Sequence, residues 1–91
     1  MKLLEFGAAW CGPCRAIRPA LAEFEKLHPG ALERIDCETD EGNAKADQYD
    51  VRSIPAIIII AASGKPVATV RPPHTLKRLI DTWRKYNEKA D

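Results

Sequence analysis

Two cysteines three positions apart are the residues in this sequence best suited to do chemistry. Cys11 and Cys14 enclose Gly12 and Pro13, and an apolar helical pattern follows them. At the start of a helix, residues i and i+3 share one face, with Cβ atoms roughly 5–6 Å apart. A disulfide needs about 3.5–4.5 Å between Cβ atoms. A small adjustment therefore opens or closes a bond between the two sulfurs, as a redox switch requires.

The expected position of each cysteine in that helix divides the chemical work. Cys11 lies where the helix should begin, and the unpaired N–H groups and helix dipole there favour an anion. We expect its thiolate to accept a hydrogen bond from the Cys14 N–H, which lowers the pKa of Cys11 and makes it the attacking sulfur. Cys14 lies one turn further in, where we expect more shielding, and suits the resolution of a mixed disulfide.

Metal binding is the alternative use of such a cysteine pair. A structural zinc site needs four ligands, and the sequence offers one C-x-x-C without a second pair or a spaced histidine motif. We therefore expect no metal and no cofactor. The third cysteine, Cys37, is interpreted as a partly buried structural thiol.

The elements that must position the cysteines follow from apolar spacing and from Pro and Gly. Residues 3–6 predict a short strand that ends at Gly7. Residues 11–28 predict one amphipathic helix that Pro19 kinks and Pro29-Gly30 ends. The remaining predicted elements are a strand over residues 31–37, a helix over 41–49, a buried strand over 56–60, a turn at Ser63-Gly64-Lys65, a strand over 67–70 preceded by Pro66, and a last helix capped by Thr75.

The order β-α-β-α-β-β-α predicts an α/β fold, in which three helices flank a four-stranded mixed sheet. The 91 residues suit a single domain over residues 1–91.

The 14 basic and 13 acidic residues are interspersed and leave a net charge of +1, which argues against nucleic acid as a partner. Glu5 interrupts the apolar N-terminus, and the longest apolar run, over residues 56–62, is too short to span a membrane. We expect a cytoplasmic monomer.

The pentapeptide Trp10-Cys11-Gly12-Pro13-Cys14 resembles the active-site signature of thioredoxins. The resemblance runs over essentially the whole chain, as a minimal thioredoxin without the family's usual first strand and helix. Pro19 matches the proline that kinks the family's active-site helix. Residues 53–56 resemble the family's loop in which a cis proline faces the disulfide. The resemblance implies that substrate contacts Trp10, Gly12, Pro13, Ile54 and Pro55.

Glu5 precedes Cys11 by six residues, where thioredoxins usually have a buried aspartate. A desolvated carboxylate there could move a proton to or from Cys14. The alternative is a solvated glutamate on an edge strand. Two departures from the family concern its partners: Asp36 is nearest to the position of a lysine that usually accompanies the buried acid, and Pro72 replaces a glycine before the last helix.

The resemblance implies a protein-disulfide reductase and electron carrier. Reduced Cys11 attacks a disulfide in a protein substrate, Cys14 releases the reduced product, and a donor similar to thioredoxin reductase recharges the pair. A cytosolic disulfide oxidase or isomerase, and a redox-inert adaptor, are the alternatives. An adaptor would be expected to lose or alter one cysteine, and both are present.

Overall fold

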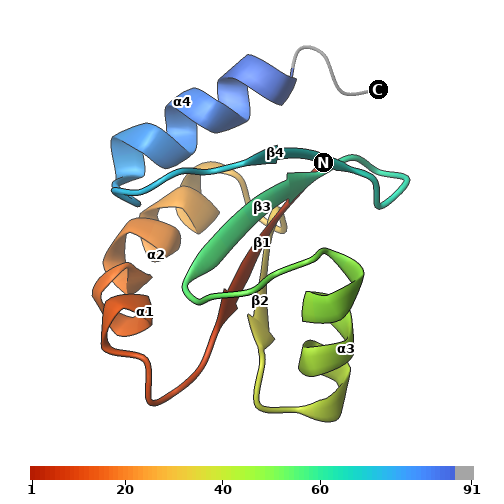
Figure 1. The fold of residues 1–91 in the computed structure, drawn as a ribbon. Coiled ribbons are helices and arrows are strands. Elements are labelled where there is room, and N and C mark those ends of the chain that lie inside the picture. The colour runs from red at the N-terminus through yellow and green to blue at the C-terminus, as the bar shows by residue number, and fades with distance from the viewer. Residues whose placement is uncertain (88–91) are drawn as a thin grey trace.

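Apart from one additional helix, the strands and helices follow one another in the order expected from the sequence (Figure 1). The computed structural model describes residues 1–87. Its elements are β1 (Lys2–Gly7), α1 (Gly12–Ala16), α2 (Arg18–Leu27), β2 (Leu32–Asp36), α3 (Asp40–Gln48), β3 (Ala56–Ile60), β4 (Pro66–Thr69) and α4 (Leu76–Asn87).

The four strands form one mixed sheet in the order β2-β1-β3-β4. β1 is parallel to β2 and antiparallel to β3, and β3 is antiparallel to β4. This confirms the predicted four-stranded mixed sheet. The register places Glu5 of β1 between Arg34 of β2 and Ile57 of β3, so Glu5 lies on a central strand.

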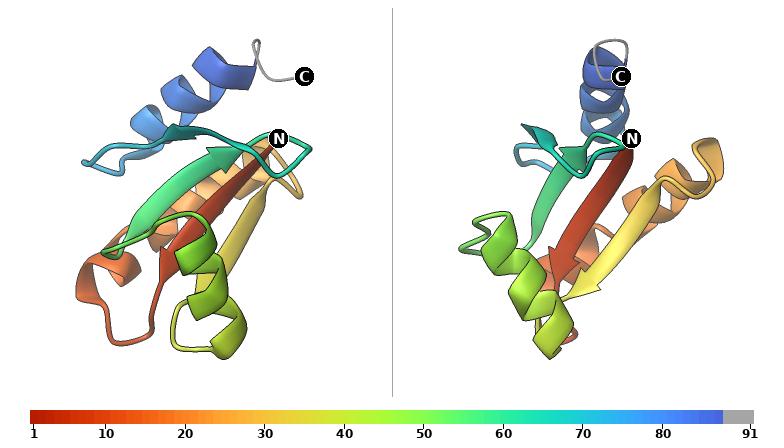
Figure 2. Two further views of the ribbon diagram at one scale, coloured as in Figure 1. Left: turned by 45° about the vertical axis from the view of Figure 1, so that its right-hand side comes forward. Right: turned by 90° about the vertical axis from the view of Figure 1, so that its right-hand side faces the viewer.

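The sheet separates two apolar cores. Because successive side chains of a strand point to opposite faces, Leu3 lies in the core that α2 and α4 cover, and Leu4 lies in the core beneath α3. Figure 2 shows α3 on one side of the sheet and α2 and α4 on the other. The four isoleucines of β3 divide between both cores, which confirms that this strand is buried on both faces.

The predicted single helix over residues 11–28 is wrong in one respect, because the structure contains two helices there. α1 ends at Ala16, Ile17 lies between the helices, and α2 begins at Arg18 with Pro19 in its first turn. Pro19 has no N–H to donate to a carbonyl one turn earlier, and its ring crowds that turn. The chain therefore ends one helix and begins another where a kink was expected, so four helices rather than three flank the sheet.

Local capping explains several element boundaries. The Thr75 hydroxyl accepts from the Arg78 N–H at 3.2 Å and caps α4, as predicted. Gly64 has φ +89° in the β3–β4 hairpin, a conformation open to glycine. The limits of the other strands and of α3 differ from the sequence predictions by at most one residue, and those of β3 match them. The structure gives no description of residues 88–91, which the predicted single domain includes. Within residues 1–87, no helix has both the length and the apolar character needed to cross a bilayer.

Candidate active site

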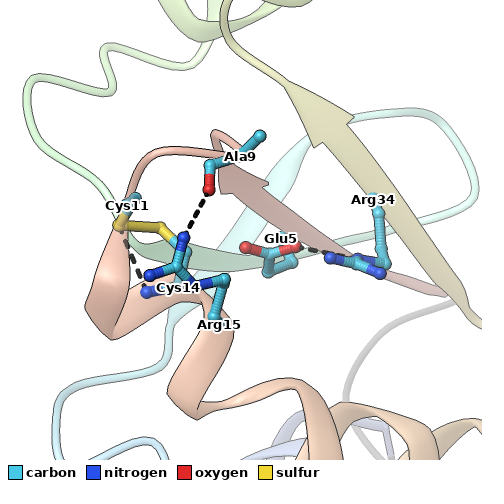
Figure 3. The surroundings of a disulfide bond; sticks show 6 residues. All are labelled: Glu5, Ala9, Cys11, Cys14, Arg15 and Arg34. Carbon is cyan, nitrogen blue, oxygen red and sulfur yellow. Dashed lines mark hydrogen bonds and ion pairs between the residues drawn. A yellow bond between two sulfur atoms is a disulfide. The ribbon is translucent and has the colours of Figure 1, made fainter.

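Cys11 and Cys14 are joined by a disulfide at the start of α1, with their Cα atoms 5.2 Å apart (Figure 3). Cys11 is the N-cap of α1, and its sulfur accepts a hydrogen bond from the Cys14 N–H at 3.2 Å. This is the hydrogen bond that the sequence predicts. Pro13 lies in the first turn, where its missing N–H leaves no helical bond unmade.

The two cysteines are almost equally shielded. Cys11 is 4% exposed and Cys14 is 3% exposed, so the predicted difference in shielding is not found. The reason is tertiary, because the two cysteines form a buried cluster with Ala8, and Ile54 packs against this cluster. The Ile54–Pro55 bond is cis, and this loop lies beside the disulfide as the family resemblance implies.

An exposed rim borders the disulfide on its solvent side. Trp10 is 66% exposed, and Gly12 and Pro13 are exposed as well. The guanidinium of Arg15 donates to the carbonyl of Ala9 at 2.9 Å and so ties α1 to the loop before it (Figure 3). The sequence does not reveal this anchoring role, because a lone arginine on a helix gives no signal of it.

Glu5 lies on the buried side of the disulfide and is 2% exposed. The interpretation of this residue as a solvated edge-strand glutamate is therefore wrong, because β1 is a central strand. Arg34 of the adjacent β2 strand donates from Nε to Glu5 Oε1 at 3.3 Å. Figure 3 shows the carboxylate lying between Arg34 and the disulfide, with its second oxygen on the Cys14 side.

The sequence prediction places Asp36 nearest to the position of the usual cation beside the buried acid, and the structure corrects this to Arg34. In the structure Arg34 is the neighbour of Glu5 across the parallel register, and Asp36 is the neighbour of Gly7. A parallel register joins residues far apart in the chain, and nothing local specifies it. The alternation of Arg34 with the buried Ile35 was the one available signal that Arg34 lies on the Glu5 face.

A cavity of about 210 Å³ reaches Glu5 and Cys14 from the β2 side. Gly7, Ala8 and Ala9 form part of its wall, and the charged side chains of Arg18, Arg34 and Asp36 line it as well. The buried side of the disulfide therefore has a polar, charge-lined opening.

Cys37 is a free thiol just after β2, and its predicted partial burial is confirmed. Burial raises the pKa of Cys37, and the negative charges of Asp36 and then Glu5 raise it further, against a smaller lowering by a hydrogen bond with the Gly7 backbone. The thiol packs at the margin of the core beneath α3. Among residues 1–87, no three His, Cys, Asp or Glu side chains gather in a way that could hold a metal ion.

Comparisons with known proteins agree with this geometry. The thioredoxin family profile matches residues 1–85. An M-type chloroplastic thioredoxin from Zea mays is 37% identical over 83 residues, which cover 89% of this chain and 50% of the maize protein. A thioredoxin from Staphylococcus epidermidis is 36% identical over 84 residues, which cover 89% of this chain and 80% of that protein.

The fold has a close structural counterpart as well. Thioredoxin 1 from Thermosipho africanus superimposes with a TM-score of 0.79 at 24% identity, over 98% of this chain and 97% of that one. The chain spans half the length of the maize relative and nearly all of the Thermosipho structure. From its sequence, its fold and its bonded cysteine pair, the chain belongs to the thioredoxin family and carries the redox-active site of a thiol–disulfide oxidoreductase.

Proposed function

We propose that the protein reduces disulfides in protein substrates, with Cys11 as the attacking sulfur and Cys14 as the resolving one. The observation that supports this most directly is the hydrogen bond from the Cys14 N–H to the Cys11 sulfur at 3.2 Å. A hydrogen bond to the charged form stabilises a thiolate. α1 has only five residues, so this local bond, rather than the dipole of a long helix, distinguishes Cys11.

The reaction proceeds by two exchanges. The Cys11 thiolate attacks one substrate sulfur, the substrate S–S bond breaks, and the released substrate sulfur takes up a proton. Cys14 then loses its proton and attacks the Cys11 sulfur of the mixed disulfide. The Cys11–Cys14 bond forms, the second substrate thiol leaves, and two electrons have passed to the substrate. An external dithiol donor similar to thioredoxin reductase restores the reduced pair.

Glu5 accepts the proton that Cys14 loses in the second exchange. The burial of Glu5 beside the equally buried Cys14 supports this role, because it puts a carboxylate within the site that can take the proton directly. The ion pair with Arg34 at 3.3 Å holds one oxygen of the carboxylate, and the other faces Cys14. Charge on Glu5 is thereby accommodated in the folded protein.

Substrates bind over the exposed rim. Trp10, Gly12 and Pro13 offer one wall beside Cys11, and the loop with Ile54 and Pro55 offers the other. An extended segment around a substrate disulfide fits between these walls, with its backbone paired to the loop before β3. We place the protein in the cytoplasm as a monomer, where a reducing pool would sustain this direction of transfer.

Reduction of insulin by dithiothreitol, followed as turbidity, tests the activity. The protein should accelerate precipitation, Cys11→Ser and Cys14→Ser should fall to the uncatalysed rate, and Cys37→Ser should match the unaltered protein. Absence of acceleration would instead favour a redox-inert adaptor. A reduction potential near that of a strong oxidant would favour a disulfide oxidase.

The order of attack has its own test. Incubated with an oxidised protein substrate, Cys14→Ser should accumulate a mixed disulfide on Cys11, because the resolving sulfur is missing. Cys11→Ser should accumulate none. Non-reducing electrophoresis detects the adduct, and equal trapping by both variants would contradict the assigned roles.

A further inference from the structure

Gly7, the last residue of β1, is buried next to the carboxylate of Glu5 and the sulfur of Cys14. A Cβ added at this position would lie 2.6 Å from Glu5 Oε2 and 3.2 Å from the sulfur of Cys14. The first of these distances is shorter than real Cβ contacts allow. The space that a side chain would occupy at residue 7 is therefore already taken by Glu5 and Cys14.

Backbone conformation does not explain the glycine. The glycines with positive φ are Gly30 and Gly64, so the backbone of Gly7 is one that an ordinary residue can adopt. Gly12, next to Cys11, shows the contrast, since a Cβ there would meet nothing within 4 Å. What position 7 requires is space.

The strand geometry explains which group fills this space. Residues 5 and 7 point to the same face of β1, and the side chain of Glu5 passes toward α1 over the place where a residue-7 side chain would stand. Arg34 holds Oε1 on the other side at 3.3 Å. The carboxylate thus lies between Arg34 and Cys14 (Figure 3). Its Oε2 occupies the space above Gly7.

We propose that Gly7 is a positioning residue of this site: its missing side chain provides the space through which the carboxylate of Glu5 reaches Cys14. This inference rests on the proposed reduction of disulfides and deepens it. When Cys14 attacks the mixed disulfide, its S–H bond breaks and an O–H bond forms on Glu5 Oε2. The proton then leaves to solvent through the cavity that Gly7, Ala8 and Ala9 help to line.

Several ionisable groups lie near enough to the carboxylate to enter any pH profile of this step. They are Arg34 and Asp36 from β2, Arg18 from α2, Cys14 from α1, and Cys37 after β2. Cys37 is removed by a Cys37→Ser background, and the others stay constant across the variants compared. A change of profile between variants therefore reports the contact between Glu5 and Cys14.

The test separates the two exchanges with an equimolar aromatic disulfide, 5,5′-dithiobis(2-nitrobenzoate), and reduced protein in the Cys37→Ser background. The first thionitrobenzoate is released when Cys11 attacks and the second when Cys14 resolves. Because a positioned base typically contributes 10²–10⁴-fold, we expect Gly7→Ala to slow the second release at least ~10-fold near neutral pH. The rate should approach that of the parent at alkaline pH, where hydroxide removes the proton, and the first release should change little.

Glu5→Gln gives the reference profile. Gly7→Ala should resemble it although the carboxylate remains, and the double variant Gly7→Ala/Glu5→Gln should be no slower than the slower single variant. A parent-like second release in Gly7→Ala, or two fully additive slowings, would overturn the assignment of Gly7. If either of these results is found and the unaltered protein still reduces insulin, the proposed function stands and only the inference on Gly7 fails.

If Gly7→Ala folds poorly, its effect on stability can be compared in two backgrounds, the parent protein and the Glu5→Asp variant. Glu5→Asp shortens the side chain by one methylene and withdraws the carboxylate from the space above residue 7. Introducing Gly7→Ala into Glu5→Asp should therefore lower the melting temperature less than introducing it into the parent. An equal loss in both backgrounds would show that Glu5 does not occupy this space, and would overturn the proposal.

Discussion

The three cysteines have three different chemical surroundings. Cys11 receives a hydrogen bond from the Cys14 N–H, and Cys14 lies beside the carboxylate of Glu5. The pKa of Cys37 is raised by its partial burial and, to a smaller extent, by the negative charges of Asp36 and Glu5. A raised pKa lowers the fraction of Cys37 that is thiolate, so we expect the third thiol to compete poorly with Cys11 for substrate disulfides.

Alkylation of Cys37 in the oxidised protein tests this separation, because Cys37 is then the remaining thiol. Its reaction rate with iodoacetamide should rise with pH to a midpoint above the ordinary thiol value of 9.0. The same oxidised protein unfolded in urea is the matched control, and its midpoint should be lower. Since the folded pKa is the higher one, folding stability should fall as pH rises through this alkaline window, and less so in Cys37→Ser. A folded midpoint at or below the unfolded one would contradict the prediction.

Helix α3 matters for the active site because, in chain order, it connects β2 to the loop in which Ile54 packs against the disulfide. The Thr39 hydroxyl caps α3 by accepting from the Gly42 N–H at 2.9 Å. Lys45 of α3 donates to Glu33 of β2 at 2.8 Å, and this hydrogen bond holds the pKa of Glu33 below its ordinary value despite some burial. These contacts fix α3 against β2, and the chain leaving α3 leads to Ile54.

Gly42 of α3 lies tightly against the end of β2. A Cβ added at Gly42 would overlap the backbone carbonyl of Asp36. Helix propensity alone favours alanine over glycine by about 1 kcal/mol. The overlap between the alanine Cβ and the backbone acts in the opposite direction, and it typically lowers the free energy of unfolding by about 1–3 kcal/mol. We therefore expect Gly42→Ala to lower the free energy of unfolding in urea. Asn43→Ala, an exposed substitution one residue along α3, should leave that free energy unchanged or slightly raised. A stabilising Gly42→Ala would show that the contact between α3 and β2 yields easily.

Across the whole molecule, the sheet and its two cores hold the site in place. Phe24 of α2 and Trp83 of α4 pack edge to face, with ring centroids 5.1 Å apart, and both lie in the core on the Glu5 face of the sheet. This contact joins the helix that follows the active site to the last helix of the chain. Stability of the site thus depends on side chains distant from the cysteines.

Removing the Phe24 ring should have a large effect on folding. Phe24 is fully buried, and a buried Phe→Ala substitution typically costs about 3–5 kcal/mol, out of a total of roughly 5–15 kcal/mol for a domain. Leu27→Ala in the same helix is the matched control, since Leu27 is 56% exposed and surface substitutions usually stay within about 0.5 kcal/mol. Urea unfolding monitored by circular dichroism measures both. Equal losses for the two variants would contradict the assignment of the core.

Much of the fold could be predicted because it follows from interactions within one helical turn or one hairpin. The hydrogen bond between Cys14 and Cys11, the cap at Thr75 and the turn at Gly64 each join residues a few positions apart. Backbone geometry alone sets such contacts, so residue type and spacing predict them. Pro19 was correctly identified as disruptive, and only its effect, two helices in place of a kink, was not foreseen.

The parts of the site that escaped prediction join residues far apart in the chain. Arg34 meets Glu5 across 29 positions, and Gly7 provides space for a carboxylate aimed at Cys14. The loop at Ile54 was expected beside the disulfide from the family resemblance alone, because no local pattern places it there. These contacts depend on strand register and on how helices pack against the sheet, which are set by burial summed over the whole molecule rather than by neighbouring residues. Short-range chemistry could thus be inferred from residue order, whereas the surroundings of that chemistry required the folded chain.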